Sequence, residues 1–516
     1  MEFELQKKPL VVARQQPGDG ILMGSYLDGD EALPVVNGRI ILPFDLFTTH
    51  IAMLGTTGSG KTTTARVIFE GVGRQRRDAQ IFFFDGNGDL AMAQVFGESL
   101  SPYGGDLLFF PQEPFDGWAG SWQAVFNRFL LMIPFAEQGG AAYFSDVETV
   151  ILQRACRMYG EPPQSYDDLM ERLDYTELRR VWGSESLRGA DSELVDALKV
   201  RIESVFTHVG KGFDGPKSFK DVRGGYFALS PMSMGKSSVT AMRMMLSQLA
   251  YYIEFEKDPE QFMLVMLDEF AAFASGVEIG PFIEQARKRN VCVVVMSQTV
   301  RGLGDPTQVL RILENAGVIF GHNSAAWIEL ERFIGSEEVA DVSWRFDAIG
   351  QVESEIVKLV ERTKVRRSQF LSLLVGQAWV LRHNDAMLMQ VDLPRQRRGL
   401  GRRFVLPEAQ ELFDVPTVGR ERVIPDLGIG VPLGGDLGIA ASPENGTAAS
   451  SPAGGASVEG PSREQDAQAP PATTAGAQGG VSAPSREAWE GAELQDGPDP
   501  FDYAKAIEKD PRANDQ

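Results

Sequence analysis

Residues 51–64, with the sequence IAMLGTTGSGKTTT, decide the fold of this chain. They contain the spacing G-x-x-x-x-G-K-[ST], in which glycines let backbone N–H groups point at an anion. Lys61 would reach the β- and γ-phosphates of a nucleotide, and the Thr62 hydroxyl would ligate Mg²⁺. We therefore expect a nucleoside triphosphate, ATP or GTP, and Mg²⁺ as cofactors, bound by Gly55, Thr57, Gly58, Ser59, Gly60, Lys61, Thr62 and Thr63.

Both flanks of this loop fit a phosphate-binding loop (P-loop). The apolar run Ile51–Leu54 is typical of a buried strand. After the loop, a helical face is predicted by the i, i+3, i+4, i+7 spacing of Ala65, Ile68, Phe69 and Val72. We expect Gly71 and Gly73 to stop that helix. A chance glycine turn would lack the two flanks, so the stretch predicts an α/β nucleotide-binding fold.

Composition limits the class of protein. The chain has 516 residues, of which 43% are hydrophobic, so we expect two or three domains plus tails. Its net charge of −21 argues against a generic nucleic-acid coat. Two cysteines, Cys156 and Cys292, provide no disulfide framework and indicate a reducing compartment. No apolar run reaches the ~18 residues of a transmembrane helix, so we expect a cytoplasmic protein that reaches membranes only through partners.

The pattern of apolar residues divides the chain into segments. Strand signals fade after residue 97, and helical spacing appears at 146–158 and 191–206. We predict a RecA-like core whose mostly parallel sheet is interrupted by an all-α insertion. The predicted parts are a small β element at 1–45, the core at 46–96 and 218–400, the insertion at 97–217, and an extension at 401–425.

The last segment, 426–516, is rich in Gly, Ala, Pro and Ser. Such a composition buries too little apolar surface to offset the entropy of ordering, so we predict a disordered acidic tail. Scattered aromatic residues between Trp489 and Ile507 favour a motif that docks a partner. A tail without a function is the alternative.

Acidic residues follow two predicted strands. Asp85 comes directly after Ile81–Phe84, and Asp268 and Glu269 come directly after Phe262–Leu267. Ligands bind outside the carboxyl ends of strands in open parallel sheets. We expect Asp85 to contact the nucleotide, Asp268 to belong to the Mg²⁺ shell, and Glu269 to polarise the attacking water.

Polar and basic residues surround the next strand, Val291–Met296. Gln298 after it could sense the γ-phosphate or hold the water, and an ordinary loop amide is the alternative. Before it, Arg287 and Arg289 could cap a helix dipole, act as an arginine finger on a neighbouring subunit, or contact DNA. Two later basic groups fit a solvated face or a phosphate-tracking channel: Arg362, Lys364, Arg366 and Arg367, and Arg395, Arg397, Arg398, Arg402 and Arg403.

The order of these motifs resembles a known superfamily. Lys61 and Asp268 are separated by about 200 residues, which suits a RecA-like core with an insertion. The segments LGTTGSGKT (54–62), FDGNGD (84–89), LDEF (267–270), QARKRNV (285–291) and SQ (297–298) resemble the HerA/FtsK superfamily of hexameric DNA translocases. LENAG (313–317) and a hairpin at 378–391 resemble the TraG/TraD-type coupling ATPases of conjugation and type IV secretion more closely.

The resemblance implies a homo-hexameric ring with ATP between subunits and DNA in its pore. It implies catalytic roles for Glu269, Gln298 and a neighbour's Arg287 or Arg289. Relaxosome, secretion or nuclease partners would bind through the tail. Coupling proteins usually carry N-terminal transmembrane helices, which this sequence lacks, so a HerA-like role in DNA repair or defence stays open. An ATPase acting on protein and a nucleotide-regulated scaffold are further alternatives.

Overall fold

The computed structural model describes residues 11–12, 20–28, 35–133, 140–187, 189–207, 209–235, 237–274, 276–325, 327–346, 352–382, 385–392 and 404–407. The predicted tail at 426–516 and the basic group at 395–403 lie outside these ranges.

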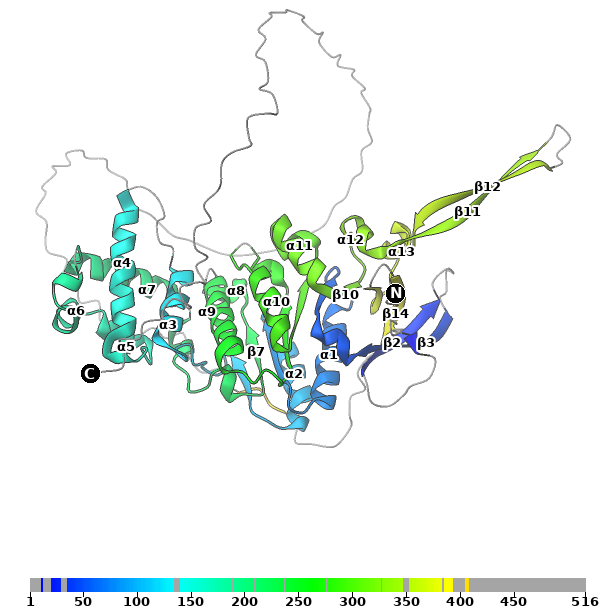
Figure 1. Ribbon diagram of the computed structural model, residues 1–516. Helices are drawn as coiled ribbons and strands as arrows, with labels where there is room; N and C mark the ends of the chain where they lie inside the picture. The colour runs from blue at the N-terminus through cyan, green and yellow to red at the C-terminus, as the bar shows by residue number, and fades with distance from the viewer. Residues whose placement is uncertain are drawn as a thin grey trace, which may run out of the picture. The chain divides into compact units, whose positions relative to one another are not determined.

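A large twisted sheet forms the centre of the fold (Figure 1). Within the described residues it has 12 strands. In spatial order they are β1 (Val11–Val12), β3 (Val35–Pro43), β2 (Gly20–Asp28), β14 (Asp385–Val391), β13 (Gln377–Arg382), β10 (Ala316–Gly321), β4 (His50–Leu54), β9 (Val291–Ser297), β8 (Met263–Asp268), β5 (Gln80–Asp85), β7 (Gly224–Ala228) and β6 (Leu107–Phe110). The strands from β10 to β6 are parallel, so their carboxyl ends meet at one edge of the sheet. The predicted α/β class with a parallel core is confirmed.

The parallel strands are buried on both faces, which explains their continuous apolar sequences. In β5, Phe82 and Phe84 point into one core, and Ile81 and Phe83 into the other. The first core lies under α3 (Trp122–Met132), α9 (Ser237–Tyr251), α10 (Gly280–Ala286) and α11 (Pro306–Asn315), and the second under α1 (Lys61–Gln75) and α2 (Leu90–Leu100).

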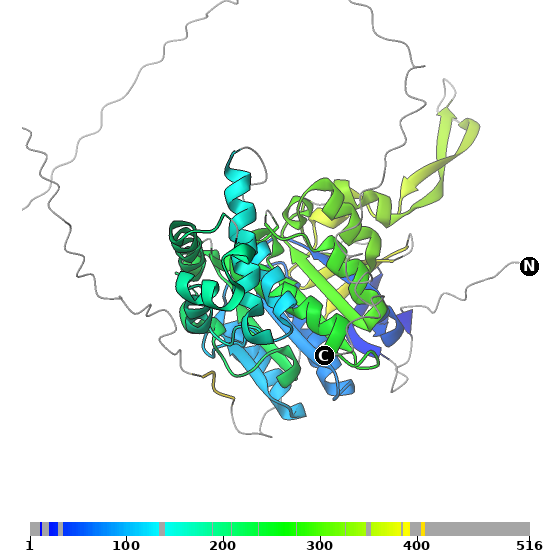
Figure 2. The same ribbon diagram turned by 60° about the vertical axis from the view of Figure 1, so that its left-hand side comes forward.

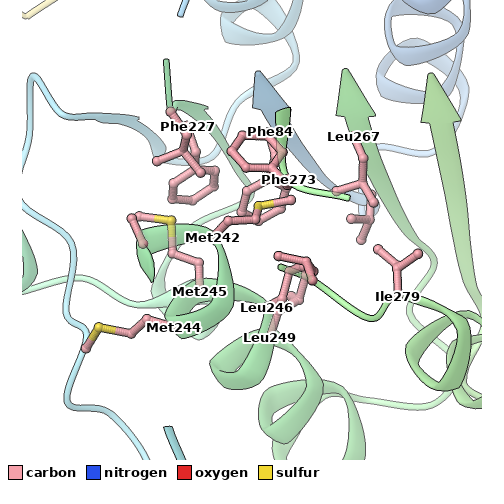
Figure 3. Close-up of a cluster of buried hydrophobic side chains, with 14 of the residues drawn as sticks. Phe84, Phe227, Met242, Met244, Met245, Leu246, Leu249, Leu267, Phe273 and Ile279 are labelled. Atoms are coloured by element: carbon pink, nitrogen blue, oxygen red, sulfur yellow. The ribbon is translucent and has the colours of Figure 1, made fainter. Parts of the chain in front are cut away.

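The methionines of α9 belong to the core, as their helical spacing predicts. Met242 and Met245 lie beside Phe84 and Phe227 of the sheet (Figure 3). The short α8 (Pro231–Met234) begins after the N-cap Ser230, whose side chain accepts from the N–H of Met232. Ser230 therefore marks the start of a short helix.

The structure differs from the predicted domain boundaries at two places. Most of the segment 97–217 is helical, with α4 (Gly140–Arg157), α5 (Tyr166–Arg172), α6 (Tyr175–Trp182) and α7 (Ser192–Phe206). However, β6 pairs with β7 inside the main sheet, so the prediction of an all-α segment from residue 97 is wrong there. A four-residue apolar run cannot be assigned to a strand by periodicity alone. The N-terminal strands also join this sheet, because β2 pairs with β14.

Helix α1 does not stop at Gly71 and Gly73, and that prediction is wrong. It continues to Gln75. A Cβ atom at Gly71 would lie 2.5 Å from Cγ2 of Ile21, and one at Gly73 would lie 2.6 Å from Cδ2 of Leu100. These glycines therefore allow close packing of α1 against β2 and α2 instead of ending the helix.

Two strands form a separate ribbon that we did not predict. β11 (Ser336–Phe346) and β12 (Val352–Thr363) pair with each other, and both views show the ribbon extending away from the main sheet (Figures 1 and 2). Arg362 of the predicted basic group lies on it, 3.9 Å from a carboxylate oxygen of Asp341. Among the helices of the described ranges, none combines the length and the apolar character that crossing a membrane requires.

Candidate active site

The predicted loop joins β4 to α1, so both predicted flanks are confirmed. Gly58 and Gly60 have φ values of 77° and 112°, which side chains other than glycine rarely adopt. These conformations let the chain turn into the start of α1, where the N–H groups of a helix's first turn and the positive end of its dipole favour an anion.

Lys61 lies along this loop. Its Nζ donates to the carbonyl oxygen of Gly55 at 2.6 Å and to that of Thr56 at 3.3 Å. Burial lowers the pKa of Lys61, and the nearby charges of Asp268 and Glu269 oppose that shift. Thr62 is exposed beside it. The structure thus brings the cation of the P-loop close to the two predicted acidic residues.

Asp85 and Asp268 lie side by side at the carboxyl edge, since they are register partners in β5 and β8. The carboxylate of Asp85 accepts from the N–H groups of Asn87 at 2.7 Å and Asp89 at 2.6 Å, and from the hydroxyl of Tyr226 at 2.7 Å. Asp85 therefore holds the turn that leads into α2, a structural task that the sequence did not reveal.

The pKa of Asp268 and the backbone conformation of Glu269 are both unusual. Burial, followed by the charge of Asp85, raises the pKa of Asp268 to about 7. Glu269 is half-buried and has a left-handed backbone, with φ 49° and ψ 47°. For a residue other than glycine this conformation costs ~1–2 kcal/mol, and such strain concentrates at functional sites. Both features fit a site that binds a cation and a reacting group.

The raised pKa of Asp268 has a consequence for stability. Since the folded pKa of Asp268 is about 7 and its ordinary value is 3.8, the unfolded chain loses this proton at lower pH than the folded protein does, and the free energy of unfolding falls between about pH 4 and pH 7. We expect Asp268→Asn to increase the free energy of unfolding by on the order of 2–4 kcal/mol at pH 8, with little difference near pH 4. Denaturant unfolding at several pH values measures this difference, and a gain that does not depend on pH would contradict it.

Gln298 lies next to the P-loop. It follows β9, which is the neighbour of β4, and the N–H of Gly55 donates to the carbonyl oxygen of Ser297 at 3.2 Å. The residues Lys61, Asp268, Glu269 and Gln298 therefore lie at the same edge of the sheet, and their catalytic and binding roles stay predictions.

Arg287 and Arg289 lie at the opposite edge. They precede β9, and the charge of Arg287 contributes, after burial, to lowering the pKa of His50 at the start of β4 to about 4. With ~3.3 Å per strand residue, β4 separates them from the P-loop of the same chain by on the order of 15 Å. The structure therefore does not bring either arginine to its own phosphate site.

The sequence reasoning missed two residues beside the P-loop, His322 and Asn323. Nε2 of His322 lies 3.1 Å from Oγ1 of Thr64, and its Nδ1 lies 2.9 Å from the carbonyl oxygen of Gln377. Because a carbonyl only accepts, Nδ1 carries the proton and Nε2 accepts from Thr64. Both residues directly follow β10, so the rule that ligands bind at the carboxyl edge would have identified them.

Comparisons with known proteins agree with this geometry. Residues 33–112 match the sequence model of the family described as Helicase HerA, central domain. The unbound bacterial conjugative coupling protein TrwBdeltaN70 is 15% identical, covers 74% of this chain and 95% of its own length, and gives a TM-score of 0.52. Plasmid coupling protein TrwB in complex with the GTP analogue GDPNP is 15% identical, with 76% of this chain and 99% of that chain covered and a TM-score of 0.52. The same protein in complex with the ATP analogue ADPNP is 14% identical, with 76% and 99% covered and a TM-score of 0.50. No curated protein sequence matches this chain significantly.

The parallel sheet and the P-loop together define the class of this protein, which has a RecA-type P-loop NTPase fold. Within that class the chain has the TrwB-like arrangement, and its resemblance to the HerA/FtsK type is confirmed by the HerA match across the P-loop and by the shared fold.

Proposed function

We propose that this protein is an ATP-hydrolysing motor of the conjugation and secretion type that moves DNA. The convergence of Lys61, Asp268, Glu269 and Gln298 at one edge of a TrwB-like sheet carries this proposal. TrwB is known in complex with ADPNP and in complex with ADP and Mg²⁺, which supports the same cofactors here.

The residues present fit both cofactors. The P-loop N–H groups and Lys61 would hold the phosphates, while the Thr62 hydroxyl and the Asp268 carboxylate are oxygen ligands of the kind that Mg²⁺ prefers. Bound Mg²⁺ neutralises phosphate charge during transfer. In this proposal Glu269 would accept a proton from the attacking water, and Gln298 would orient that water.

We further propose that a second copy of this chain completes the site within a ring. The superfamily that the sequence resembles implies that this ring is a homo-hexamer. Arg287 and Arg289 lie at the far edge of their own sheet, so an arginine finger from either must come from a neighbour. DNA would pass the exposed cations Arg366 and Arg367. Relaxosome, secretion or nuclease proteins would dock on the acidic tail.

DNA should stimulate ATP hydrolysis. We expect a several-fold higher rate with double-stranded DNA at ~50 mM salt and loss of most of that stimulation by ~200 mM, because contacts to phosphates release counterions. Steady-state ATPase assays with and without DNA across this range test the proposal. If DNA does not change the rate of ATP hydrolysis at any salt concentration, and a protein binds through residues 426–516, these results would instead support the alternative of an ATPase acting on protein.

A further inference from the structure

The segment 371–376, which joins α13 (Arg367–Leu371) to β13, lies directly against the P-loop. The N–H of Gly376 donates to the carbonyl oxygen of Ser59 at 2.9 Å. A Cβ atom at Gly60 would lie 2.9 Å from the backbone N and Cα of Gly376. The two loops are therefore in backbone contact, with no room for a side chain between them.

Two polar residues fix the segment in this place. Asn323 donates from Nδ2 to the carbonyl oxygens of Leu371 at 2.9 Å and Leu373 at 3.0 Å. The carbonyl oxygen of Asn323 accepts from the N–H of Thr56 at 2.9 Å. His322 makes a second bridge between Thr64 and the carbonyl oxygen of Gln377. Since burial lowers the pKa of His322 to about 4, its imidazole ring is neutral at physiological pH.

Three of the four aliphatic side chains of the segment are exposed. The N–H of Leu374 donates to Oε1 of Gln377 at 3.0 Å, and Leu373 is buried. Leu371, Leu374 and Val375 are 42%, 67% and 75% exposed. Single exposed apolar residues are common, but here three occur together on a short segment that is fixed to a phosphate-binding loop.

We propose that Leu371, Leu374 and Val375 form an apolar platform for the base and sugar of the nucleotide whose phosphates the P-loop holds. This inference rests on the proposed function. A nucleoside is covalently attached to its phosphates, so its sugar and base must lie near the P-loop that holds them. The segment that carries the platform is in backbone contact with that loop. Small-molecule sites combine such apolar surfaces with a few placed polar groups. Aliphatic side chains do not read the hydrogen-bonding edge of a base, so ATP and GTP should depend on the platform alike.

The test compares ATP with inorganic tripolyphosphate, which has the phosphates but no base. In the full-length protein, Leu374→Ser with Val375→Ser should weaken the binding of ATP and GTP roughly tenfold and leave tripolyphosphate binding unchanged, as measured by calorimetry with Mg²⁺. Serine is neutral, so the electrostatics of the P-loop stay the same. Val200→Ser on α7, where the valine is 62% exposed, is the matched control and should change nothing.

The other outcomes separate this inference from the proposed function. Equal weakening of ATP and tripolyphosphate would mean that the segment only supports the P-loop, and the inference would be wrong. Unchanged binding of all three ligands would also overturn it, and the platform would then be free to contact another subunit. If the unaltered protein binds neither ATP nor tripolyphosphate, the proposed nucleotide site itself fails, and the inference fails with it.

Discussion

Glu269→Gln should lower ATP turnover by about 10²–10⁴-fold while ATP binding stays close to that of the unaltered protein. Glutamine has nearly the shape of glutamate, so the left-handed turn at φ 49° and the hydrogen bond from its N–H to Oδ1 of Asp268 at 2.8 Å can both be kept. What is lost is the ability to accept a proton from the attacking water. Because the phosphate-binding groups lie on other elements, β4 and α1, binding does not depend on this carboxylate.

Single-turnover hydrolysis and equilibrium binding of ATP, measured on the same preparation, separate these two effects. Glu203→Gln, at an exposed position of α7, is a control with the same chemical change and should hydrolyse ATP normally. Hydrolysis at the unaltered rate in Glu269→Gln would show that another group is the base, and the assignment of Glu269 would have to be withdrawn.

Lys61→Ala should abolish both ATP binding and turnover. The Lys61 ammonium is the cation that the structure places beside Asp268 and Glu269, so its removal leaves two carboxylates facing an anionic ligand. The carbonyl oxygens of Gly55 and Thr56 also lose their donor. We expect a loss of turnover of at least ~10³-fold, comparable to the loss of other charged groups that stabilise phosphoryl transfer.

The combination of the two variants is more informative than either alone. Binding of a fluorescent ATP analogue should persist in Glu269→Gln and disappear in Lys61→Ala, while Lys220→Ala, at an exposed position, should behave as the unaltered protein does. Thermal unfolding without nucleotide checks that Lys61→Ala is folded. If a folded Lys61→Ala protein binds ATP as tightly as the unaltered protein, the phosphate site lies elsewhere.

Local patterns predicted the parts of this site that follow buried strands. The spacing around Lys61 fixes the anion-binding loop, since glycine is required where φ is 77° and 112°. Six apolar residues before Asp268 identify a central strand, and its position at the strand end follows from chain order alone. The same reasoning failed at Gly71, because a glycine in a helix can serve close packing by Ile21, a residue far away in sequence.

What the sequence determined by itself is the P-loop, the buried parallel strands and the acidic and amide residues at their ends, because backbone conformation and burial leave local periodic signals. The tertiary structure alone decided the order of the strands. That order makes Asp85 the neighbour of Asp268, and it brings His322 and segment 371–376 to the P-loop. These contacts join residues up to about 300 positions apart, and strand pairing across such distances depends on packing of the whole sheet, which no local pattern records.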